Sequence, residues 1–184
     1  MSAPSIETPD WSKCQFFFGD ERWVPHDHPD SNFAMAKKSL FSQIAIPSAN
    51  IHPIPTQCQT AAECAADYEK QIKLYNQFDL VLLGIGTDGH TASLFPDTSI
   101  LNENTKKVAA VFVDKLNTWR ISLTYPGLNN SRRVIVLVQG SSKAKIIKEI
   151  MTPNHQQHFP VSRLSPTGDL IWCMDRDAMS LIPE

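Results

Sequence analysis

A strand-like apolar run that ends in a glycine-rich loop constrains this sequence more than any other feature. Residues 78–83 read Phe-Asp-Leu-Val-Leu-Leu and lead directly into a loop containing Gly84, Gly86, Gly89 and His90. An almost continuous apolar run of this length is typical of a strand covered on both faces of a parallel sheet. We therefore expect a central parallel strand whose carboxyl end carries a titratable loop.

Strand-like and helix-like segments alternate along the rest of the chain. The expected strands are residues 14–18, 108–113, 120–124, 133–138 and 170–174; the expected helices are 31–43, 60–76, 142–151 and a short one near the C-terminus. Thr60 and Glu63 have the spacing of a capping box at the start of the second helix. A brief helix over residues 91–95 is also expected, because Pro96 would end it. The alternation predicts one α/β domain with a parallel or mixed sheet.

The composition excludes several classes of partner. Seventeen Lys and Arg residues against nineteen Asp and Glu residues give a formal net charge of −2, too balanced for a protein that binds the phosphate backbone of nucleic acids. The apolar runs are strand-sized, far short of the roughly 20 residues that span a bilayer, and no export signal is visible. We expect a cytoplasmic protein with no nucleic-acid or membrane partner.

The four cysteines indicate neither a metal site nor a disulfide framework. The chain has cysteines at Cys14, Cys58, Cys64 and Cys173. None of them has the CxxC spacing that is typical of zinc sites and redox motifs. In a cytoplasmic protein such cysteines are predicted to be reduced.

The glycine loop predicts a ligand site beside an ionisable side chain. Ligands of open α/β sheets bind at the carboxyl ends of the strands, and residues 19–28, 84–90 and 140–143 follow three expected strands. The Gly84-x-Gly86-x-x-Gly89 spacing matches the fingerprint of a dinucleotide-binding site. That fingerprint also needs a second strand that ends in an acidic residue about 20 residues further along the chain, and this sequence has none. A tight turn with a surface histidine remains the plain alternative.

His90 is the candidate general base of this site. An imidazole has an ordinary pKa near 6.5 and can take a proton from water at cytosolic pH. The expected helix N-terminus beside it would keep the ring uncharged.

Cations at two further strand ends indicate an anionic ligand. Arg22 follows Asp20 and Glu21, and Lys143 starts a helix after Gly140; a guanidinium and an ammonium at such positions suit a phosphate group. The plain alternative for residues 20–22 is a surface ion pair. Arg120 is either a solvent-facing residue or a third contact to the same anionic ligand.

With these residues, the chain resembles the 6-phosphogluconolactonase family over about residues 11–178. The specific parts are Phe17-Phe18-Gly19-Asp20-Glu21-Arg22-Trp23-Val24-Pro25 and Gly84-Ile85-Gly86-Thr87-Asp88-Gly89-His90-Thr91-Ala92-Ser93-Leu94-Phe95-Pro96. The resemblance implies a Rossmann-like, mostly parallel α/β sheet of the sugar-phosphate isomerase/deaminase kind, with a small antiparallel portion. It also implies hydrolysis of 6-phospho-D-glucono-1,5-lactone without a metal or organic cofactor.

The resemblance further implies roles for individual residues. His90 would activate water, Asp88 and Gly89 would position it, and Arg22 and Lys143 would hold the phosphate. Asp20, Gly86 and Arg120 would complete the substrate pocket. The implied partner is a phosphorylated sugar lactone, bound by a monomer or weak homo-oligomer.

Two rival functions stay open at this point. A glucosamine-6-phosphate deaminase-like isomerase shares the Asp-Gly-His loop, but that family continues with an acidic residue where this chain has residues 91–96. The other rival is a non-catalytic sugar-phosphate-binding domain. Members of the resembled family begin some tens of residues earlier, with a strand and a phosphate-binding loop, so residues 1–184 are expected to form a single, N-terminally truncated domain.

Overall fold

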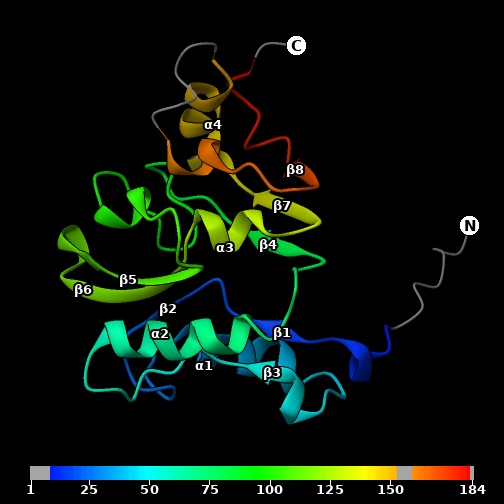
Figure 1. The fold of residues 1–184 in the computed structure, drawn as a ribbon. Coiled ribbons are helices and arrows are strands. Elements are labelled where there is room, and N and C mark those ends of the chain that lie inside the picture. Colours follow the sequence, from blue (N-terminus) through cyan, green and yellow to red (C-terminus); the bar gives the residue numbers. More distant parts are fainter. Residues whose placement is uncertain (1–8, 153–158, 183–184) are drawn as a thin grey trace, which may run out of the picture.

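Three small sheets organise the chain in the computed structural model, which describes residues 9–152 and 159–182 (Figure 1). β1 (Phe16–Phe17) pairs in parallel with β3 (Ile51–His52). β2 (Asp20–Arg22), β6 (Thr118–Leu123) and β5 (Val108–Val113) form an antiparallel sheet in that order. β4 (Val81–Leu83), β7 (Arg133–Val138) and β8 (Asp169–Met174) form a parallel sheet. The predicted α/β fold with parallel strands and a small antiparallel part is confirmed.

Helices begin where the capping residues predict. The Ser31 hydroxyl accepts from the backbone N–H of Ala34 at the start of α1 (Asn32–Ala36), and a π-helical segment (Lys37–Phe41) continues that helix. The capping box of Thr60 and Glu63 is present at α2 (Ala61–Ile72), which ends earlier than expected. α3 (Tyr125–Asn129) was not predicted, and α4 (Ala144–Met151) follows a 3₁₀ turn at Ser141–Lys143.

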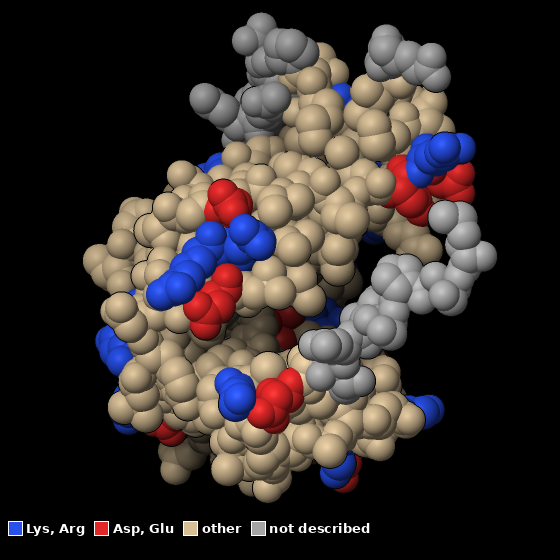
Figure 2. Space-filling view, turned by 90° about the vertical axis from the view of Figure 1, so that its right-hand side faces the viewer, with Lys and Arg blue, Asp and Glu red and all other residues tan. Residues whose placement is uncertain are grey.

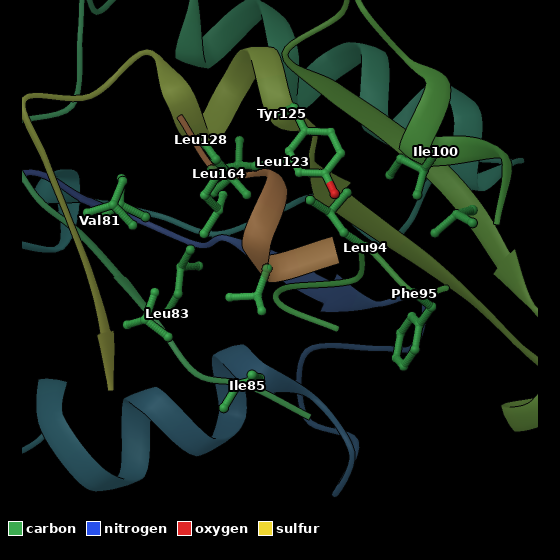
Figure 3. Packing of buried hydrophobic residues seen from close by; sticks show 14 of the residues in the cluster. Val81, Leu83, Ile85, Leu94, Phe95, Ile100, Leu123, Tyr125, Leu128 and Leu164 are labelled. Carbon is green, nitrogen blue, oxygen red and sulfur yellow. The ribbon is translucent and has the colours of Figure 1, made fainter. Parts of the chain in front are cut away.

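One hydrophobic cluster runs through these layers. Val81, Leu83 and Ile85 of the β4 segment lie on one side of it, with Leu94 and Leu164 toward the antiparallel sheet (Figure 3). α2 packs against β5 and β6 through its buried face. Among the described helices, none is long and apolar enough to cross a membrane.

The position of β4 differs from the prediction of a strand covered on both faces. Within the described residues β4 pairs only with β7, and Leu80 and Leu82 are 49% and 59% exposed while Val81 and Leu83 are buried. Apolarity alone predicted burial of both faces, but the described part of the chain packs side chains against one face only.

Two further segments correct the sequence reading. Residues 91–95 form no helix: they make a turn closed by a bridge between Thr91 and Leu94, with Ala92 at φ 48°. Residues 20–22, expected in a loop, form β2 and pair with β6. Near the C-terminus, residues 176–181 form turns rather than a helix.

Buried Glu21 explains why so charged a segment becomes a strand. Its carboxylate accepts from the backbone N–H groups of Arg22 (2.8 Å), Asn32 (2.7 Å) and Phe33 (2.8 Å) and from the Ser31 hydroxyl (3.0 Å). It thus caps α1 from outside the helix and ties that helix to β2. A buried carboxylate is tolerated only with such complete hydrogen bonding.

Replacing Glu21 by Ala is expected to lower the free energy of unfolding by about 3 kcal/mol or more, because several buried donors lose their acceptor together. Urea unfolding of the variant and the parent measures this difference. Asp67→Ala is the control, since Asp67 forms an exposed pair with Lys70 that contributes less than about 1 kcal/mol. Equal losses in the two variants would contradict a special role for Glu21.

The structure also corrects the prediction of four reduced cysteines. Cys58 and Cys64 form a disulfide with their Cα atoms 5.5 Å apart, whereas Cys14 and Cys173 are free. The disulfide joins the loop before α2 to its first turn, where Cys64 is fully buried. Spacing rules missed it because the α2 N-cap, rather than a CxxC turn, brings the two residues together.

Candidate active site

A cavity of about 420 Å³ lies between the parallel and antiparallel sheets. Its lining residues come from β2 and the residue before it, the start of α1, the end of β4 with the loop after it, β6 and the turn before α4. They are Gly19, Asp20, Arg22, Asn32, Leu82, Leu83, Gly84, Ile85, Gly86, His90, Thr91, Ala92, Arg120 and Lys143. One face of the molecule is visibly hollowed, with charged side chains inside the hollow (Figure 2). The cavity therefore gathers the three loops that the sequence places at strand ends.

The glycine loop is a tight turn stabilised by its own backbone. The Gly86 N–H donates to the His90 carbonyl (2.8 Å), and the Gly89 N–H donates to the Gly86 carbonyl (3.0 Å). A Cβ atom at Gly86 would collide with the His90 ring, and Gly89 has a φ of 77° with Phe159 against it. These glycines serve close packing and turn geometry, and their N–H groups are engaged within the loop.

His90 is held by Asp88 on the same loop. The His90 Nδ1 atom lies 2.5 Å from Asp88 Oδ1, and the His90 backbone N–H also donates to that oxygen (3.2 Å). Burial raises the pKa of Asp88, but hydrogen bonds from Lys115 and His90 outweigh this and lower it to about 2. An ionised carboxylate only accepts, so in the neutral form of the ring Nδ1 carries the proton and Nε2 has the lone pair.

Two arginines face one another across the antiparallel sheet. Arg22 in β2 is the direct cross-strand partner of Arg120 in β6, a placement in which like charges are unfavourable. The Nε atoms of both side chains are buried and have no hydrogen-bond partner among the described residues. Burial, together with the charge of Arg22, lowers the pKa of Arg120. Two like charges are therefore held side by side, each with a donor left unpaired.

Asp20 compensates only part of this positive charge. Its carboxylate accepts from the Ser93 hydroxyl (2.6 Å) and the Asn32 amide (3.1 Å), and it lies 3.8 Å from an Arg120 nitrogen. Burial raises the pKa of Asp20, against the lowering effect of Ser93, Arg120 and Arg22. Asp20 thus pairs with Arg120 and is itself held by Ser93 and Asn32.

Lys143 reaches the cavity from the opposite sheet. It ends the 3₁₀ turn that follows Gly140, whose φ is 88°. The Asp175 carboxylate accepts from the Gly140 N–H at 3.0 Å and so anchors this turn. Lys143 adds a third cation to the same cavity.

The predicted site residues divide into two groups. Those that line the cavity are Asp20, Arg22, Gly86, His90, Arg120 and Lys143; Asp88 and Gly89 lie behind them and support the loop. Sequence reasoning gave no role to Asn32 or Ser93, although Ser93 belongs to the second motif that carried the resemblance. Their polarity beside apolar residues was the available signal.

No group of three or more His, Cys, Asp or Glu side chains suited to a metal ion occurs within residues 9–152 and 159–182.

Comparison with known proteins places the chain among sugar-phosphate enzymes. The family model described as glucosamine-6-phosphate isomerases/6-phosphogluconolactonase matches residues 1–172. A 6-phosphogluconolactonase of Synechocystis is 41% identical over 177 residues, covering 91% of this chain and 73% of the relative.

Solved structures show the same fold. The crystal structure of a devB protein superposes with a TM-score of 0.88 at 32% identity, covering 99% of this chain and 79% of the other. A 6-phosphogluconolactonase from Thermotoga maritima gives a TM-score of 0.80 at 31% identity, with 91% and 75% covered.

Proposed function

Because this chain belongs to the glucosamine-6-phosphate isomerase/6-phosphogluconolactonase family, we propose that it hydrolyses 6-phospho-D-glucono-1,5-lactone to 6-phospho-D-gluconate in the oxidative pentose phosphate pathway. The observation that carries the assignment to this site is the Asp88–His90 pair at a cavity whose far wall holds two opposed arginines. The pair supplies a base, and the arginines supply a place for the phosphate.

His90 acts as the general base in this proposal. Its Nε2 atom takes a proton from water as the water oxygen bonds to the lactone carbonyl carbon. The tetrahedral intermediate then breaks its bond to the ring oxygen, which leaves with the proton that the imidazolium returns. Asp88 keeps the ring in the required tautomer and stabilises the transient imidazolium. A lactone is an activated ester, so a positioned water and one base suffice.

Arg22, Arg120 and Lys143 bind the phosphate in this proposal. A dianionic phosphate would give the buried Nε donors of both arginines an acceptor and would relieve their mutual repulsion. Charge-assisted hydrogen bonds of this kind are the strong ones, and a guanidinium can make two in parallel. Asp20 contributes by orienting Arg120.

The proposal is tested by supplying the purified chain with freshly prepared lactone and following acid release in a pH-stat at neutral pH. Release above the spontaneous hydrolysis rate is expected. Ammonia release from glucosamine 6-phosphate, assayed in parallel, would instead indicate a deaminase. Binding of either phosphosugar without turnover would indicate a non-catalytic binding domain.

A further inference from the structure

A lysine outside the cavity touches the proposed catalytic pair. Lys115 lies in the 3₁₀ turn (Asp114–Leu116) at the tip of the β5–β6 hairpin, and its ammonium group pairs with Asp88 Oδ2. The other oxygen of the same carboxylate accepts from His90 Nδ1. One carboxylate is therefore shared between the imidazole and an ammonium group from a segment 27 residues away.

A buried aromatic ring makes a second connection between the lysine and the histidine. The Phe95 ring stacks on the His90 ring with centroids 4.0 Å apart and an interplanar angle of 27°. The Lys115 Nζ atom lies 4.6 Å from the centroid of the same Phe95 ring, within the range of a cation–π interaction. Phe95 is only 3% exposed, so both partners rest on a fixed surface.

The hairpin tip has a defined conformation. Val113 and Thr118 are paired across the hairpin, and Asn117 ends the turn in the left-handed conformation with φ 46° and ψ 46°. The Lys115 side chain is half exposed.

The contacts of Lys115 differ from those of the other cations near His90. Lys115 touches both the carboxylate that holds His90 and the ring that stacks on it, whereas Arg22, Arg120 and Lys143 line the cavity. Residues 91–95 form no helix, so the orientation of the His90 ring depends on Asp88 and Phe95, and both of these touch Lys115.

We propose that Lys115 is a positioning residue that, through Asp88 and Phe95, fixes the orientation of the His90 ring in the cavity wall. The inference rests on the proposed role of His90 as the base. Lys115 does not line the cavity, so it acts on the base and not on substrate binding.

Lys115→Met is expected to lower kcat for the lactone about tenfold, because a base that is less well oriented takes the proton from water less often. The KM for the lactone should change less than about twofold. Lys115→Arg, which keeps the cation, should restore kcat. Lys70→Met is the matched control, because it removes an exposed Lys–Asp pair on α2, and its kcat should match that of the parent.

NMR of the aromatic ring protons gives a readout that needs no turnover. The nuclear Overhauser effect between the His90 and Phe95 rings, whose centroids lie 4.0 Å apart, should weaken in Lys115→Met and return in Lys115→Arg, with His90→Gln serving to assign the resonance. An unchanged effect in Lys115→Met would overturn the inference. If no variant or parent hydrolyses the lactone, the proposed function fails, while the NMR measurement still decides whether Lys115 positions His90.

Discussion

Replacing His90 by Ala is expected to lower turnover of the 6-phosphorylated lactone at least ~100-fold, the usual loss when a general base is removed. His90 is the one histidine that lines the cavity within the described residues, and Asp88 leaves its Nε2 as the acceptor. Because the phosphate contacts lie on other elements, the KM should change little. Initial rates, corrected for spontaneous hydrolysis, measure both parameters.

His52→Gln is the control for this experiment. His52 lies outside the cavity lining and contacts Gln15 and the Phe17 ring, so its replacement should leave turnover within about twofold of the parent. Near-normal turnover in His90→Ala would remove the imidazole from the mechanism. A rise in KM with kcat unchanged would assign it to binding instead.

Arg22→Ala is expected to raise the KM for the 6-phosphorylated lactone tenfold or more. Losing a charge-assisted hydrogen bond costs roughly 1.5–3 kcal/mol, which corresponds to about a 10- to 150-fold loss of affinity. Lys143→Ala should change the KM in the same direction. Glucono-1,5-lactone, which lacks the phosphate, should be hydrolysed equally by the variant and the parent.

Comparing the two lactones distinguishes a loss of phosphate recognition from a structural defect in the variant. Arg133→Ala is the control, because Arg133 pairs with Asp169 on the exposed face of the parallel sheet. It should leave both KM values unchanged. If Arg22→Ala impairs both lactones alike, Arg22 has a structural role and the phosphate is bound elsewhere.

Local sequence patterns predicted the elements that their own apolar or capping residues define. β5 and β7 have the bounds that their apolar runs indicate, and the capping box located the start of α2. β2 was missed because its burial depends on Glu21, whose carboxylate is satisfied by the backbone of α1. No local pattern reveals that a charged side chain has found distant partners.

In the candidate site, too, the sequence predicted the residues that are close along the chain and missed the contacts between distant segments. His90, Asp88 and the glycines share one loop, so the motif placed them together. Lys115 could not be assigned from sequence, because only the β5–β6 hairpin brings it to Asp88. The direct opposition of Arg22 and Arg120 likewise depends on the register of β2 against β6.

From the opposition of Arg22 and Arg120 we expect a link between anion binding and thermal stability. Any anion that binds the folded form between the two guanidinium groups, and does not bind the unfolded chain, shifts the folding equilibrium by mass action. At a hundred times its Kd such an anion adds about 2.7 kcal/mol, which for a chain of this size corresponds to a melting temperature higher by about 5–10 °C. The melting temperature of this protein is therefore expected to depend on its buffer as well as on its sequence, and to rise as inorganic phosphate is added.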